Sequence, residues 1–230
     1  MIKVEHLCVG QSFSDISDLS VDVGEGQVYV LLSSGDIVNN HLGNIFLGLE
    51  RAFKGMVAVD GADILPSLRG GQKSFIFIDN RRDWPHSLKT ADVIAFFQKE
   101  VKIPEEELEE LFLRLDMGNI RRKKIHELAE VEWRKLIFGL AGLRKCKNYV
   151  IRDFAKGMPL DFVLDFKRNL FDMRNNGCAV LYLSNDVFFA REIANRVGFM
   201  KKGKLLLELT GARLKKMDLN DLYFKFLAED

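Results

Sequence analysis

Short apolar runs recur along almost the whole chain, and this feature limits the possible folds more than any other. The runs are rich in Val, Ile, Leu and Phe, are bounded by turn residues, and span residues 2–4, 28–32, 56–59, 75–78, 149–151, 179–183 and 197–200. Near-continuous apolar runs of this length suit strands that are buried on both faces. Segments whose apolar residues recur at helical spacing lie between many of these runs. This alternation predicts an α/β fold with a parallel sheet.

Two segments show the helical period most clearly. One follows Pro104, whose missing N–H needs no partner in a first helical turn, and its apolar residues recur at helical spacing over 108–115. The other begins at about 160 and continues through Phe171 until Asn175, Asn176 and Gly177 stop it, and a strand over 178–183 follows. This strand, helix and strand order is the repeating unit of a parallel sheet.

The stretch between Trp84 and Leu143 carries no convincing strand pattern. It is interpreted as a helical subdomain, 84–143, inserted into an α/β core made of residues 1–83 and 144–230, the whole forming one compact domain. An acidic block over 105–110 and a basic block over 121–124 are interpreted as solvated surface.

Composition excludes several classes of function. The 230 residues are 47% hydrophobic and 29% charged, and the net charge of +1 gives no field for non-specific nucleic-acid binding. No apolar run is long enough to span a membrane, and the first residues lack a signal-peptide pattern, so a cytoplasmic protein is expected. Three widely spaced cysteines rule out a disulfide framework. The histidines have no ligands at metal-binding spacing, so no metal site is expected.

Longer segments, in their order along the chain, resemble an ATP-binding cassette (ABC) transporter ATPase. They read IKVEHLCVG, ISDLSVDVGEGQVYVLLSS, FLGLERAFKGMVAVDGADI, HELAEVEWRKLIFGLAGL, YVIRDFAKGMP and VLYLSNDVFFAREIANRVGFMKKGKLL. The likeness covers essentially the whole chain. It implies a P-loop NTPase-type α/β core with an N-terminal antiparallel β part and an inserted helical subdomain.

The P-loop of the resembled family, G-x-x-x-x-G-K-[ST], wraps ATP phosphates in backbone N–H groups and adds a lysine and a metal-binding hydroxyl. Here the positions are occupied by Ser33, Gly35, Asp36, Val38, Asn39 and Asn40. Ser33 and Val38 replace the two motif glycines. Asn39 stands in place of the lysine and Asn40 in place of the Ser/Thr. Asp36 adds negative charge where phosphates would lie, so the phosphate cradle is expected to be lost.

The family's metal-holding aspartate and following glutamate correspond to Arg152 and Asp153 in YVIRDF. Arginine cannot ligate a metal ion, and Asp153 is one methylene shorter than the glutamate. A surface-directed Arg152 is expected; the alternative is that it neutralises Asp36 or Asp153. Asn185 replaces the family's switch histidine, Asn80 replaces a glutamine, and Phe13 is a candidate for stacking on adenine, with core packing as its alternative. Asp153, Asn185 and Asn80 are therefore vestigial, and no catalytic set is intact.

The family's signature motif, L-S-G-G, meets the partner subunit's ATP at a helix N-terminus. The corresponding residues are Leu128, Ala129, Glu130 and Val131. Ala129 has no hydroxyl, Glu130 repels phosphate and Val131 blocks close backbone approach. This subunit is therefore not expected to complete the ATP site of a partner subunit.

The resemblance implies a degenerate ABC subunit that does not hydrolyse ATP and binds ATP and Mg²⁺ only weakly if at all, so no cofactor is expected. It is expected on the inner face of the cell membrane, with a membrane permease and a competent ABC ATPase as partners, in a homo- or heterodimer. Trp84, Phe96 and Phe97 are candidates for the permease interface, with helical core as their alternative. Two rival functions stay open: an active but divergent ABC ATPase that uses Asp153, and a soluble interaction module that reuses the fold.

Overall fold

The computed structural model describes residues 1–10, 15–50, 53–64, 74–82, 84–85 and 87–225. Phe13 and His86 therefore lie outside the described residues. The chain divides into two compact units, one made of Met1–Asp79 with Cys146–Asp230 and the other of Asn80–Lys145. Each unit has a hydrophobic core of its own.

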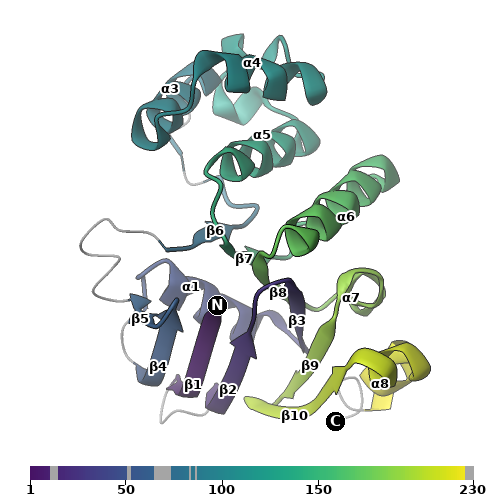
Figure 1. The fold of residues 1–230 in the computed structure, drawn as a ribbon. Helices are drawn as coiled ribbons and strands as arrows, with labels where there is room; N and C mark the ends of the chain where they lie inside the picture. Colours follow the sequence, from purple (N-terminus) through teal and green to yellow (C-terminus); the bar gives the residue numbers. More distant parts are fainter. Residues whose placement is uncertain (11–14, 51–52, 65–73, 83, 86, 226–230) are drawn as a thin grey trace. The chain divides into compact units, whose positions relative to one another are not determined.

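The larger unit contains a six-stranded sheet in the order β10-β9-β3-β8-β7-β6 (Figure 1). Its strands are β3 (Gln27–Ser33), β6 (Ile76–Ile78), β7 (Asn148–Arg152), β8 (Ala179–Ser184), β9 (Arg196–Lys201) and β10 (Lys204–Thr210). All neighbours pair in parallel except β9 and β10, which pair antiparallel. Every residue of β7 and β8 is buried, as expected for strands written as continuous apolar runs.

A second, antiparallel sheet in the same unit has the order β2-β1-β4-β5. Its strands are β1 (Ile2–Val9), β2 (Ile16–Val23), β4 (Phe53–Val59) and β5 (Ala62–Asp63). Along most of β2 buried and exposed residues alternate, which is the pattern of a strand with one face on the core. This is the N-terminal antiparallel β part that the resemblance implied.

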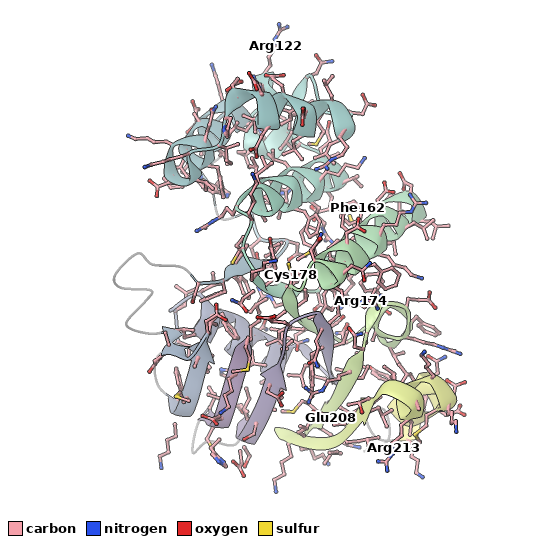
Figure 2. The ribbon with its side chains drawn as sticks, in the orientation of Figure 1. Arg122, Phe162, Arg174, Cys178, Glu208 and Arg213 are labelled. Carbon is pink, nitrogen blue, oxygen red and sulfur yellow. The ribbon has the colours of Figure 1, made fainter. Side chains whose placement is uncertain are left out.

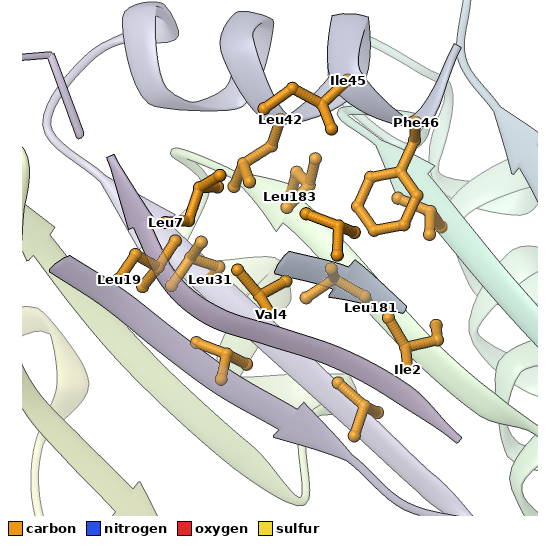
Figure 3. Close-up of a cluster of buried hydrophobic side chains, with 14 of the residues drawn as sticks. Ile2, Val4, Leu7, Leu19, Leu31, Leu42, Ile45, Phe46, Leu181 and Leu183 are labelled. Carbon is orange, nitrogen blue, oxygen red and sulfur yellow. The ribbon is translucent and has the colours of Figure 1, made fainter. Parts of the chain in front are cut away.

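The main core of this unit lies among the two sheets and helix α1 (Asp36–Phe46). Figure 3 shows its centre, where Val4, Leu19, Leu31, Leu42 and Leu183 come from β1, β2, β3, α1 and β8. These side chains are almost fully buried. The helix that follows the P-loop position is therefore held by apolar packing of its inner face.

Helices also cover the opposite face of the parallel sheet. They are α6 (Leu160–Asn175) and α7 (Val187–Ile193), and two short helices, α8 (Gly211–Lys216) and α9 (Leu219–Tyr223), follow β10. Phe166 of α6 stacks on Phe189 of α7 with ring centroids 5.8 Å apart, and Tyr182 of β8 packs against both rings. Strand β8 alternates Leu181 and Leu183 toward one layer with Tyr182 toward the other.

The smaller unit is helical. It contains α3 (Thr90–Val101), α4 (Glu105–Arg114) and α5 (Glu130–Leu143), with the 3₁₀ turns η2 (Ile120–Arg122) and η3 (Ile125–Glu127) between them. Trp133, Leu136 and Leu140 of α5 lie in its core. Within the part of this unit that the structure describes there is no strand, only an isolated bridge between Lys89 and Lys124.

No described helix in either unit has the length and apolar character needed to cross a bilayer.

Candidate functional site

The carboxyl ends of the parallel strands bring together the altered motif positions of the larger unit. Ser33 ends β3, Arg152 ends β7 and Ser184 ends β8, and α1 begins at Asp36 just after β3. In open α/β sheets ligands bind outside this edge of the strands. This edge of the larger unit is therefore the candidate site.

Arg152 occupies the centre of the site and is buried. Its side chain is 11% exposed, its Nη2 lies 2.8 Å from Asp79 Oδ2, and its Nη1 donates a 3.1 Å hydrogen bond to Asn40 Oδ1. The expectation that Arg152 points to the surface is wrong. Its buried charge is compensated by Asp79, which directly follows β6 and belongs to none of the motifs. The alternative partners, Asp36 and Asp153, are not the ones the structure shows.

Gly43 on α1 allows this arrangement by its lack of a side chain. A Cβ at this position would lie 3.0 Å from Arg152 Nη1 and 3.2 Å from the Phe77 ring. The guanidinium carbon is also 5.9 Å from the centre of that ring. The helix, the ring and the guanidinium therefore form one packed unit.

These residues do not fit a magnesium ion. A guanidinium is permanently charged and cannot be a ligand, and here it stands where the family places a metal-binding carboxylate. The Asn40 oxygen, at the Ser/Thr position, already accepts a hydrogen bond from it. The positive charge at this edge comes from the chain itself.

Asn39 and Val38, on the first turns of α1, are turned into the protein. Asn39 is 1% exposed, and neither polar atom of its amide has a hydrogen-bond partner. It supplies no positive charge at the lysine position. Val38 is part of the main core. Its side chain therefore has a packing role at the second glycine position.

The loop between β3 and α1 is closed by hydrogen bonds within the chain. Ser33 Oγ donates a 2.6 Å bond to the Gly35 carbonyl, and Asn185 Nδ2 donates a 3.1 Å bond to Asp36 Oδ1. Lys156 Nζ donates a further 3.1 Å bond to Asn185 Oδ1. Asn185, at the switch position, thus joins an acidic and a basic side chain, and the negative charge of Asp36 is held by an internal partner.

Asp153 is fixed by the neighbouring strand. Ser184 Oγ donates a 2.8 Å hydrogen bond to Asp153 Oδ1, and the backbone of Asp153 is left-handed, with φ at 44°. Burial raises the pKa of the Asp153 carboxyl, an effect that the Ser184 bond and the charge of Lys156 partly offset. A carboxylate held in this way is a structural partner of Ser184.

The signature positions, in the helical unit, are also internally paired. Ala129 precedes α5, and its N–H donates a 2.8 Å bond to Glu132 Oε2. Glu130 forms salt bridges with Arg82 and Arg134, each at 2.7 Å. The glutamates therefore supply the negative charge that a helix N-terminus favours.

The remaining signature positions take part in packing. Leu128 is buried and its carbonyl accepts a 2.8 Å bond from Arg82 Nη1, while Val131 is half-buried. Asn80 is exposed and begins the helical unit. Only for the positions in the larger unit does the structure therefore show a shared site.

The three aromatic candidates for an interface differ in exposure. Trp84 and Phe97 are partly buried against the core of the helical unit, whereas Phe96 is 54% exposed. The rings of Phe96 and Phe97 meet edge to face, 6.0 Å apart. Core packing therefore accounts for Trp84 and Phe97, and Phe96 is the one of the three that offers a large free apolar surface.

Four residues that contact the altered motif residues were not predicted from the sequence: Asp79, Ser184, Lys156 and Arg82. The position of Asp79 at the end of an apolar run was a usable signal, because the carboxyl ends of parallel strands meet at one edge. His41 was also unexplained, and its ring nitrogens lie 2.7 Å from Glu50 and 3.2 Å from Asp15. Among the residues placed by the structure, no group of three or more His, Cys, Asp or Glu could hold a metal ion.

The fold is that of an ABC ATPase. A solved ATP-binding subunit of an ABC transporter superposes with a TM-score of 0.87, at 14% identity and with both chains fully covered. A nucleotide-free ATP-binding cassette from an ABC transporter gives a TM-score of 0.78 at 15% identity, covering 100% of this chain and 99% of the other. The expected ABC ATPase-like fold class is thus confirmed.

Curated relatives are ABC transporter ATP-binding proteins at low identity. A putative ABC transporter ATP-binding protein of Treponema denticola is 19% identical over 95% of this chain, which spans 43% of that protein. The molybdate/tungstate import ATP-binding protein WtpC of Pyrococcus horikoshii is 23% identical, with 90% of this chain and 61% of WtpC covered. No protein-family model matches the sequence. The chain is similar to ABC transporter ATP-binding subunits.

Proposed function

We propose that the chain is a degenerate ABC transporter subunit that does not hydrolyse ATP and acts as a structural or regulatory partner on a membrane permease. The observation that carries the proposal is the buried Arg152, which pairs with Asp79 and bonds Asn40 where the resembled family would hold its metal ion. The similarity to ABC transporter ATP-binding proteins supports the transporter part of the proposal.

The site lacks the charged groups that ATP hydrolysis requires. Phosphoryl transfer depends on a metal ion and positioned cations that neutralise the developing charge. Asn39 offers no cation, Asp36 offers a carboxylate, and Arg152 is already engaged with Asp79. A subunit built this way acts through its contacts, so we place it beside a competent ATPase on the cytoplasmic face of the membrane.

Mg-ATP is expected to bind with a dissociation constant of about 1 mM or weaker, a binding free energy of about −4 kcal/mol. The physical reason is the missing lysine charge at Asn39 together with the carboxylate of Asp36. Isothermal titration calorimetry measures this constant, with an intact ABC ATPase in the same buffer as the positive control. Micromolar binding with ATP turnover would instead establish the active, divergent ATPase.

Phe96→Ala is expected to weaken recruitment to permease-containing membranes by about 2 kcal/mol, roughly 30-fold, because exposed aromatics dominate interface energetics when they become buried. The measurement is sedimentation with membranes of the source cell, with the co-purified integral protein identified by mass spectrometry. Thermal melting is expected to stay unchanged.

Leu113→Ala is the matched control, because Leu113 is an apolar residue of the same unit that is 81% exposed. It is expected to leave recruitment intact. Equal recruitment of the Phe96 variant and the unmutated chain would remove Phe96 from the interface. Failure of the unmutated chain to bind any permease would favour the soluble interaction module.

A further inference from the structure

A surface hollow of about 870 Å³ lies at the amino ends of the parallel strands. Gln27, which begins β3, lines it, whereas Ser33 of the candidate site ends the same strand. Arg174 of α6, Arg191 of α7 and Lys215 of α8 also line it, and Figure 2 labels Arg174 in this part of the unit. The volume lies in the range of small-molecule sites, about 300–1,000 Å³.

Two charged residues of the lining are already paired. Glu192 forms a salt bridge with Lys167, whose hydrogen bond lowers the pKa of the Glu192 carboxyl. Arg196 is bound by Glu208 at 2.7 Å and by Asp22 at 3.2 Å. These residues are therefore not the ones free to bind a ligand.

Three cations of the lining remain uncommitted. The side chains of Arg174, Arg191 and Lys215 form no salt bridge or hydrogen bond with any residue placed by the structure. Arg174 lies over the ring of Phe171, with its guanidinium carbon 4.9 Å from the centroid, which leaves its N–H groups available. Glu25 is the one uncommitted acid of the described lining.

The neutral amides of the lining also present donors. Gln27 Oε1 accepts bonds from Gly24 N at 3.1 Å and Arg196 Nη1 at 3.3 Å, and Asn195 Oδ1 accepts a 2.7 Å bond from Val28 N. Because these bonds occupy the amide oxygens, the free atoms of Gln27 and Asn195 are the NH₂ groups. Most of the uncommitted polar groups around the hollow are therefore hydrogen-bond donors.

Helix carboxyl ends offset part of the positive charge. Arg174, Arg191 and Lys215 lie in the last turns of α6, α7 and α8, respectively. Each helix end contributes about half a negative elementary charge. Glu25 and the second carboxylate on Arg196 offset this charge further, so the lining as a whole is close to neutral. The uncommitted hydrogen-bond donors, rather than a net charge, therefore favour anions with several acceptor oxygens.

We propose that this hollow binds a small organic or inorganic anion with more than one carboxylate or phosphate group. The site is separate from the vestigial nucleotide site, because the two lie at opposite ends of β3. Its occupant would be a soluble ligand of the subunit, independent of ATP hydrolysis.

Calorimetry with pyrophosphate and with citrate, each in metal-free, low-salt buffer, tests the proposal and separates phosphate from carboxylate ligands. Saturable one-to-one binding is expected for at least one probe. The double variant Arg174→Gln/Arg191→Gln is expected to weaken it at least tenfold. The matched control is Arg168→Gln/Lys216→Gln, which removes the same charge from α6 and α8 outside the hollow and is expected to leave affinity within twofold.

Absence of saturable binding by both probes would overturn the proposal, as would equal weakening by the two double variants, which would mean general charge attraction. If the Arg174/Arg191 variant fails to fold, arginine modification by phenylglyoxal in the unmutated protein replaces it. Pyrophosphate or citrate should then protect Arg174 and Arg191 but not Arg168. Probe binding is measured without ATP or permease, so failure of this proposal is distinguishable from failure of the proposed transporter role.

Discussion

Replacing Arg152 with methionine is expected to lower the free energy of unfolding by about 3–5 kcal/mol, the cost of breaking a buried ion pair from one side. Methionine retains apolar volume beside Phe77 but leaves Asp79, which is 11% exposed, without its guanidinium partner. Chemical denaturation followed by circular dichroism measures the loss.

The control is Arg168→Met, since the Arg168 side chain is 75% exposed and its salt bridge with Asp165 lies on the surface of α6. Such surface pairs contribute about 1 kcal/mol or less. The double variant Arg152→Met/Asp79→Leu should recover much of the loss, because it removes the buried carboxylate as well. A loss below about 1 kcal/mol in Arg152→Met would mean that the pair does not hold this edge together.

Arg152→Asp, the variant that restores the family's acidic residue, is expected to be less stable still and to remain without ATP turnover. It places a second carboxylate beside Asp79, and like charges at a buried site repel. Turnover stays absent because catalytic groups that act as a unit are strongly non-additive, so one restored residue does not recover the others. Asn39→Lys alone is expected to be equally inactive.

Phosphate release from ATP and thermal melting, each measured with and without magnesium, check this second expectation. Asp79→Asn added to Arg152→Asp should restore stability but not turnover. ATP hydrolysis by Arg152→Asp alone or by Asn39→Lys alone would show that the rest of the site is competent. The explanation that several catalytic residues were lost together would then be wrong.

The parallel sheet could be predicted from sequence because β3, β7 and β8 are buried on both faces, and their sequences are therefore nearly continuous apolar runs. Strands β2 and β10 were missed because each mixes buried with exposed positions, and a search for apolar runs passes over them. The helical unit was visible from the period of its apolar residues. The exact extents of the domains and the roles of the site residues remain predictions.

The contents of the site were harder to predict, because its contacts join residues that are far apart in sequence. Arg152 is 73 positions from Asp79 and 112 from Asn40. Motif comparison identified which positions had changed but not what the new side chains contact. The acid next to Arg152 in sequence, Asp153, is not its partner, and only the fold brings Asp79 to it.

The guanidinium at the carboxyl edge of the sheet also bears on how this subunit can respond to its surroundings. The occupancy of an ion or nucleotide site depends on the ligand concentration relative to the dissociation constant, and conformations that need the ligand shift when its concentration changes. A positive charge that is covalently part of the chain is present at every concentration of metal and nucleotide. The packing of α1, β6 and β7 around Arg152 should therefore keep one geometry when the cellular ATP concentration falls. Metal-chelating agents should also leave this packing intact.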